Sequence, residues 1–136
     1  MVNRASLDTS VLLRLALNDP PEVSEAVSDF ITSSDIKFKI PDLAITEAVF
    51  VMGGELYNFS RNTIKKVLEL VFDCPNFDYN KALFDRVFDL FVSHPKLSFN
   101  DCYLVCKAEE EEQLPFYTLD QKLAKQADAA KLLPLS

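Results

Sequence analysis

The stretch Ser6–Leu13, SLDTSVLL, decides how the fold is interpreted, because an acidic residue stands between a short apolar step and a helix pattern. Asp8 is a good N-cap for that helix, since its carboxylate can accept the unpaired backbone N–H groups of the first turn. The same arrangement returns in SFNDCYLV at Asp101 and in FYTLDQKL at Asp120. Each acid, taken singly, is expected to be an N-cap, and the recurrence raises the question of a shared site.

The composition is that of one globular unit. Of 136 residues, 49% are hydrophobic and 11% aromatic, which is enough to bury a sizeable core. We therefore expect a single domain over residues 1–136. No apolar run approaches the roughly 20 residues of a membrane span, and the start, MVNRASLD, lacks the apolar stretch of a signal peptide. A cytoplasmic protein without membrane contact is expected.

Cysteine and histidine usage favours neither disulfides nor zinc. The three cysteines, Cys74, Cys102 and Cys106, and the single His94 form neither an even disulfide set nor a zinc pattern. We expect reduced thiols, with Cys102 and Cys106 in the core and His94 on the surface. The formal charge of −7 argues against a protein that coats nucleic acid by neutralising phosphates, unless several acids gather around one metal site.

Helix is the dominant pattern along the chain. Apolar spacing predicts helices at residues 10–18, 22–34, 43–52, 61–72, 80–93 and 101–113 and from residue 121 onward. Asp19-Pro20-Pro21 is expected to end the first helix and cap the second, and Ser60 to cap the fourth. The fifth helix carries an apolar stripe that predicts core: Phe84, Val87, Phe88 and Phe91.

The strands are short and separated by helices. Residues 36–40, IKFKI, alternate apolar residues with Lys37 and Lys39, a strand period that places the lysines on a wetter face. Further strands are expected at VNRAS (residues 2–6), FYTL (116–119) and AKLLPL (130–135). This order predicts an α/β fold with a short, mainly parallel sheet flanked by helices. The carboxyl ends of parallel strands share one edge, where Asp8 and Asp120 would lie.

Glu47 differs from the three aspartates because it lies inside a predicted helix. Its neighbours at three- and four-residue spacing are apolar: Leu43, Ala44, Phe50 and Val51. A carboxylate buried on such a face needs a cation, a hydrogen-bond donor or a metal ion opposite it. A structural salt bridge, for instance to Arg14, is the alternative to a metal site.

Four converging carboxylates would repel one another unless positive charge lies between them. Helix N-termini supply part of that charge, and a divalent metal supplies much more. Oxygen ligands suit Mg²⁺ or Mn²⁺, and the lack of histidine and paired cysteine ligands disfavours Zn²⁺.

The order and context of these acids resemble the PIN-domain ribonucleases, specifically the VapC-type toxins of toxin–antitoxin pairs. The resemblance covers nearly the whole chain and rests on four segments: LDTSVLLRL with Asp8, IPDLAITEAVFVM with Glu47, LSFNDCYLVCKAEE with Asp101 and FYTLDQKLAK with Asp120. Ser10 and Thr118 match positions where the family usually carries a small hydroxyl or amide residue near the metal.

The resemblance implies a PIN-like three-layer fold and metal-dependent RNA hydrolysis. The four acids would hold one or two Mg²⁺ or Mn²⁺ ions, which activate a water and stabilise the transition state. It also implies a homodimer and a small antitoxin that inserts a segment into the acidic groove. Arg61, Lys65 and Lys66 are candidates for RNA contacts, with ordinary solvated charge as the alternative. The run Glu109–Glu112 is interpreted as a solvated helix end that an antitoxin could use.

Other classes fit less well. A phosphoacceptor receiver domain needs an adjacent acidic pair early in the chain and a late lysine, and neither is evident. A haloacid-dehalogenase-type phosphatase needs an Asp two residues after its nucleophile, where Ser10 stands. A PIN-fold binding module with weak or no catalysis is the remaining alternative, and metal dependence would separate it from a nuclease.

Overall fold

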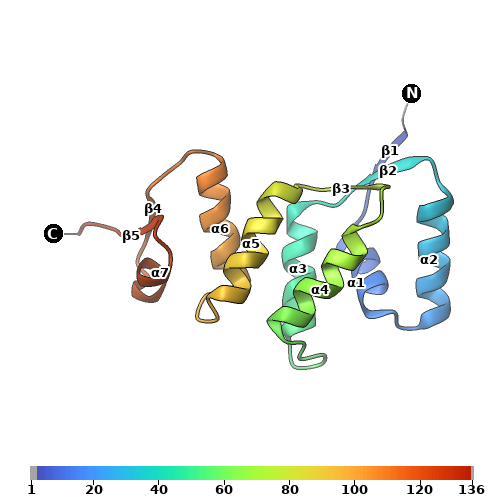
Figure 1. Cartoon of the computed structure of the whole chain (residues 1–136), viewed down its shortest axis with the longest axis horizontal. Coiled ribbons are helices and arrows are strands. Elements are labelled where there is room, and N and C mark those ends of the chain that lie inside the picture. Colours follow the sequence, from blue (N-terminus) through green and yellow to red (C-terminus); the bar gives the residue numbers. More distant parts are fainter. Residues whose placement is uncertain (1–2, 136) are drawn as a thin grey trace. The chain divides into compact units, whose positions relative to one another are not determined.

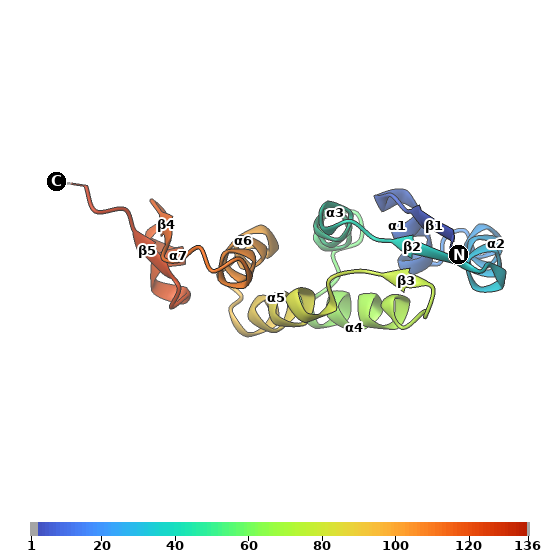
Figure 2. The same ribbon diagram turned by 90° about the horizontal axis from the view of Figure 1, so that it is seen from above.

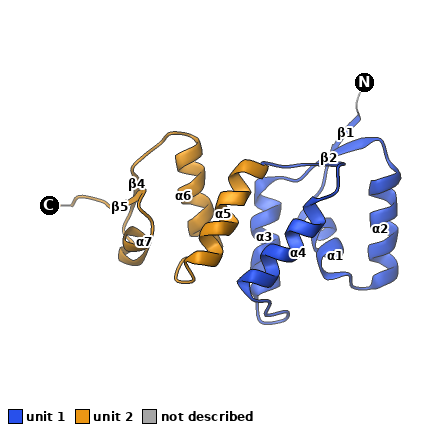
Figure 3. Cartoon of the chain, viewed as in Figure 1, with its two compact units in different colours: residues 1–80 blue, residues 81–136 orange. Residues whose placement is uncertain are grey.

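The computed structural model describes residues 3–135, so Val2, the start of the expected first strand, lies outside the described residues. The chain divides into two compact units, residues 1–80 (unit 1) and 81–136 (unit 2), coloured separately in Figure 3. That residues 1–136 form a single domain stays a prediction. No helix within residues 3–135 is long and apolar enough to cross a membrane.

Unit 1 contains a three-stranded parallel sheet with β2 in the centre. Its strands are β1 (Asn3–Ser6), β2 (Ile36–Lys39) and β3 (Phe77–Asp78). Ser6 pairs with Lys39, and Lys39 with Asp78, so the three strands end at the same edge. The predicted alternation in β2 is confirmed, because Phe38 is buried while Lys37 and Lys39 are exposed. Figure 2 shows β1 and β2 side by side.

Four helices complete unit 1: α1 (Thr9–Leu17), α2 (Pro21–Ser33), α3 (Asp42–Gly53) and α4 (Arg61–Phe72). The short helix α1 packs against each of the other three helices (Figure 1). The Ser60 hydroxyl accepts the backbone N–H of Thr63 at 3.2 Å, which confirms the predicted cap of α4. The segment Asp19-Pro20-Pro21 stands at the start of α2 as predicted, with Pro20 at the N-cap position, although no side chain caps the helix.

Unit 2 is built on the helix pair α5 (Lys81–Ser93) and α6 (Phe99–Glu110). The predicted stripe of α5 is confirmed as core. The ring centroids of Phe88 and Phe91 each lie 5.1 Å from the ring centroid of Phe99 on α6. The unit ends with β4 (Phe116–Thr118), α7 (Gln121–Gln126) and β5 (Ala130–Leu132), and β4 pairs in parallel with β5.

The α/β class with short parallel strands flanked by helices is therefore confirmed. One difference is the distribution of the strands, which form one sheet in each unit rather than a single sheet. A second is β3, which the sequence did not predict. Its two residues are too few for the period-2 alternation that reveals a strand.

The predicted burial of Cys102 and Cys106 is confirmed, while Cys74 is partly exposed. His94 is half-buried, with Nδ1 2.7 Å from the Ser93 hydroxyl. The interpretation of Glu109–Glu112 as a solvated run is wrong for Glu109, which is half-buried and pairs with Arg86 at 3.0 Å.

Candidate metal centre

Asp8 lies in the short connection between β1 and α1, at the carboxyl edge of the sheet in unit 1. Its Oδ1 accepts the backbone N–H groups of Ser10 and Val11 at 3.1 and 3.3 Å, which confirms it as the N-cap of α1. The same oxygen accepts the Ser10 hydroxyl at 2.5 Å. The bond from the Ser10 hydroxyl, followed by that from the Val11 N–H, lowers the pKa of Asp8 below its ordinary value. The side chain is thus oriented and held ionised.

Glu47 is brought to the same end of unit 1 by α3. The helix follows β2 directly, and β2 ends beside β1, where the Leu7 N–H donates to the Lys39 carbonyl at 2.9 Å. The Thr9 hydroxyl donates to Glu47 Oε2 at 2.6 Å. Because Thr9 is the chain neighbour of Asp8, this bond ties the Glu47 carboxylate to the first turn of α1.

The expected burial of Glu47 is wrong, and the alternative of a salt bridge to Arg14 is not observed in the described part of the chain. The side chain is exposed rather than buried, since Leu43 and Phe50 on its helix face are themselves 67% and 79% exposed. Within residues 3–135 Glu47 forms no salt bridge to Arg14, whose guanidinium donates instead to the Asp19 carbonyl. Glu47 does lie inside a helix as predicted, but the apolar residues on its helix face do not pack around the carboxylate.

Asp101 lies in the first turn of α6 in unit 2, but it is not the N-cap. Ser98 holds that position, and its hydroxyl accepts the Asp101 backbone N–H at 3.1 Å. The predicted N-cap role of Asp101 is therefore wrong. In the part of the chain from 3 to 135, its carboxylate accepts no hydrogen bond and forms no ion pair, so it is available to a ligand.

Asp120 is the N-cap of α7, as predicted. Its Oδ1 accepts the backbone N–H groups of Lys122 and Leu123 at 2.9 and 3.2 Å. The Thr118 hydroxyl, at the end of β4, accepts the Asp120 N–H at 3.0 Å. Thr118 therefore orients the turn that carries Asp120.

The structure links Asp8 and Glu47 in unit 1, whereas Asp101 and Asp120 belong to unit 2. Among the residues from 3 to 135, no three or more His, Cys, Asp or Glu side chains form a group that could hold a metal ion. The convergence of all four acids stays a prediction. The donor chemistry fits Mg²⁺ or Mn²⁺, because the candidate ligands are carboxylate and hydroxyl oxygens.

The candidate RNA contacts lie on α4. Lys65 is 3.9 Å from Glu69 in an i,i+4 ion pair, while Arg61 is half-buried and Lys66 is exposed. The ion pair is what ordinary surface charge would form, so RNA contact by this helix stays a prediction. Thr9 is the site residue that the sequence analysis missed, although the hydroxyl next to Asp8 in the DTS segment was a usable signal.

Comparison with known families identifies the class of protein. The PIN domain matches residues 5–129, a range that includes all four acids and extends through both units. The chain belongs to the PIN-domain family. PIN domains are generally nucleases, and they typically use divalent metals. Searches of curated proteins and of solved structures gave no match.

Proposed function

We propose that the protein is a divalent-metal-dependent endoribonuclease that hydrolyses RNA phosphodiester bonds. The observation that supports it best is the Thr9 to Glu47 hydrogen bond, which holds two acids of the PIN pattern at one end of unit 1. Family membership supports nuclease chemistry in general, and RNA as the substrate is part of the proposal.

The four acidic residues would have different roles as metal ligands. Asp8, held ionised by Ser10 and the first turn of α1, would be one ligand of Mg²⁺ or Mn²⁺. Asp101 would be another, because its carboxylate is not used as a helix cap. Glu47 and Asp120 would complete the set directly or through water. A bound dication supplies an activated water and charge stabilisation for the transition state.

A toxin role belongs to the same proposal. The protein would be the toxin of a VapC-type toxin–antitoxin pair in the cytoplasm, act as a homodimer and be restrained by a small antitoxin. These features rest on the family resemblance of the four acidic segments. The alternative is a PIN-fold binding module with little or no catalysis, and the acids argue against it because none of the four is lost.

The test compares the purified chain with Asp101→Asn on a panel of structured RNAs, in Mg²⁺, in Mn²⁺ and with chelator. We expect cleavage that requires the metal and falls more than about 100-fold in the variant. The matched control is Asp128→Asn, the same substitution at an exposed position of unit 2. Cleavage indifferent to chelator and to Asp101→Asn would reject the mechanism.

A second readout does not depend on finding the right RNA. Titration with Mn²⁺ should broaden the NMR signals of residues around Asp8, and Asp8→Asn should abolish the effect while Asp128→Asn preserves it. Binding of Mn²⁺ without cleavage of any RNA would favour the binding-module alternative.

A further inference from the structure

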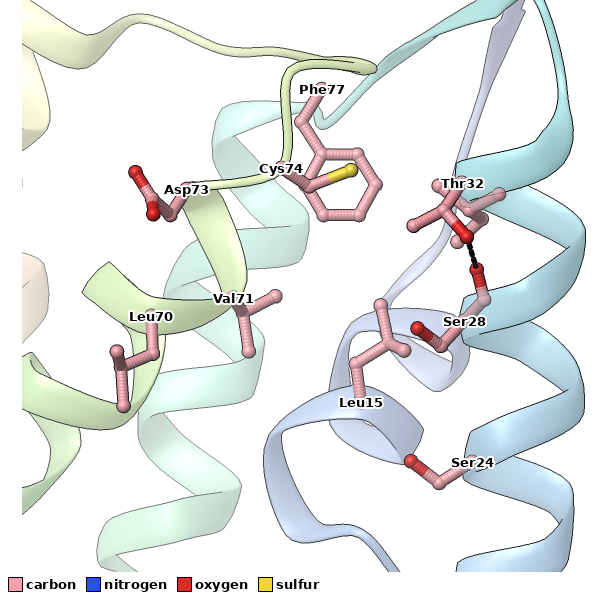
Figure 4. A pocket seen from close by; sticks show the side chains of 10 residues that line it. Leu15, Ser24, Ser28, Thr32, Leu70, Val71, Asp73, Cys74 and Phe77 are labelled. Carbon is pink, nitrogen blue, oxygen red and sulfur yellow. Dashed lines mark hydrogen bonds between the residues drawn. The ribbon is translucent and has the colours of Figure 1, made fainter.

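A cleft of about 430 Å³ opens in unit 1 and takes no part in the proposed reaction. It exists because α2 and α4 both pack on the short helix α1, which leaves space between the two longer helices. Its volume is within the range of small-molecule sites, about 300–1,000 Å³. Figure 4 shows the side chains that line it.

One side of the cleft is apolar and the other carries hydroxyl groups. Leu15 of α1, Val71 of α4 and Phe77 of β3 provide hydrocarbon surface. The facing helix, α2, contributes Ser24, Ser28 and Thr32, which are spaced four residues apart and so lie on one helix face. Figure 4 shows the Ser24 and Ser28 oxygens directed toward the Leu15 side of the cleft.

Ser24 places a hydroxyl group in the cleft that a ligand can use. It is the buried polar residue of the chain between residues 3 and 135, with an exposed fraction of 6%. Its hydroxyl forms no hydrogen bond to another residue in that range, and its oxygen is open to the cleft, since no fully buried side-chain oxygen among residues 3–135 lacks a partner. Thr32, by contrast, donates to the Ser28 carbonyl at 2.9 Å. A ligand that reaches the cleft would satisfy Ser24.

The charge of the lining limits the class of ligand. Asp73 is the charged lining residue, and Figure 4 shows its carboxylate turned away from the other lining side chains. An ammonium group would find no partner inside the cleft, and a carboxylate or phosphate would find no cation. Burial of an unpaired charge is strongly unfavourable. The lining therefore selects an uncharged molecule.

We propose that this cleft binds a small uncharged molecule with a hydrocarbon body and one hydrogen-bonding group that pairs with Ser24. The hydrocarbon would lie against Leu15, Val71 and Phe77. This inference is independent of the proposed nuclease function, because none of these residues belongs to the candidate metal centre.

Cys74 provides a direct readout because its thiol also lines the cleft. It is partly exposed, whereas Cys102 and Cys106 are buried, so iodoacetamide should modify Cys74 first. Alkylation of the full chain, followed by intact mass, is compared in 1-hexanol, hexylammonium and hexanoate, which share one hydrocarbon and differ in charge. We expect 1-hexanol to slow alkylation and the two ions to have little effect.

Two variants and a control localise the effect. Ser28→Leu should fill the cleft and remove protection by 1-hexanol, whereas Ser33→Leu, the same change outside the lining of α2, should retain it. Ser24→Ala preserves the space and should weaken protection about five- to tenfold, the value of one hydrogen bond. Equal protection by all three probes, no protection by 1-hexanol, or unchanged protection in Ser24→Ala would overturn the proposal.

Discussion

Asp8 in unit 1 is the N-cap of α1, whereas Asp101 in unit 2 lies in the first turn of α6, and the surroundings of the two carboxylates are opposite. Asp8 accepts two backbone N–H groups and the Ser10 hydroxyl, so its carboxylate is already oriented. Asp101 leaves the cap to Ser98, and its carboxylate has no partner among residues 3–135. The carboxylate near the start of the helix therefore serves as the cap at Asp8, whereas at Asp101 the cap is Ser98.

Thr9 offers the strongest way to sharpen this comparison. Thr9→Val removes the donor to Glu47 while leaving the side-chain shape nearly unchanged, so Glu47 loses its orientation beside Asp8. We expect RNA cleavage to fall about 10- to 100-fold at limiting Mg²⁺, the effect of losing a residue that orients a metal ligand. Cleavage rates over a Mg²⁺ titration measure it.

The controls separate positioning from folding. Thr9→Ser keeps a donor hydroxyl and should restore most of the activity. Thr46→Val makes the same substitution next to Glu47, where the hydroxyl donates to the Leu43 carbonyl, and should have little effect on the Mg²⁺ titration. If Thr9→Val and Thr46→Val behave alike, the positioning role of Thr9 is wrong.

Helix capping in unit 2 gives a smaller, purely energetic contrast. Ser98→Ala removes the acceptor for the Asp101 N–H and should lower the free energy of unfolding by about 1 kcal/mol. Asp101→Ala should change it by less than about 0.5 kcal/mol, because the carboxylate makes no cap. Urea unfolding of both variants measures the difference. A larger loss in Asp101→Ala than in Ser98→Ala would reverse the assignment of the cap.

The smallest expected effect is on the titration of Asp8. Its folded-state pKa is below the ordinary 3.8, so the ionised form stabilises the fold above that pH and the contribution is lost as the pH falls below it. Ser10→Ala removes the largest cause and should move the pKa of Asp8 back toward 3.8. NMR titration of the side-chain carboxyl carbon measures the shift, with Ser33→Ala as the control. An unchanged pKa in Ser10→Ala would show that the hydroxyl is not the main cause.

Much of the fold was predictable because its signals are local. The alternation in IKFKI identified β2, and the aromatic stripe from Phe84 to Phe91 identified the core face of α5. The strand β3 was missed because Phe77–Asp78 owes its pairing to β2 rather than to its own pattern. Local patterns therefore reveal elements, while pairing between distant segments adds the ones they miss.

The site was less predictable than the fold. The sequence indicated Asp8 and Asp120 as caps correctly, since capping depends on the residue and the turn that follows it. It misjudged Asp101 because Ser98, three residues earlier, competes for the same role. The exposure of Glu47 depends on what covers the apolar face of α3, and that is a tertiary property.

The parallel pairing of β1, β2 and β3 has a consequence for synthesis on the ribosome. Asn3 pairs with Ile36 and Phe38 pairs with Phe77, so each strand pair of unit 1 forms only after a long connecting segment has been made. A chain that emerges from its amino terminus presents Asp8 and Glu47 well before Asp101 has been translated. Under the proposed function, the growing protein would carry Asp8 and Glu47 while it still lacks Asp101 and Asp120, and RNA cleavage would begin only after those two residues have been translated.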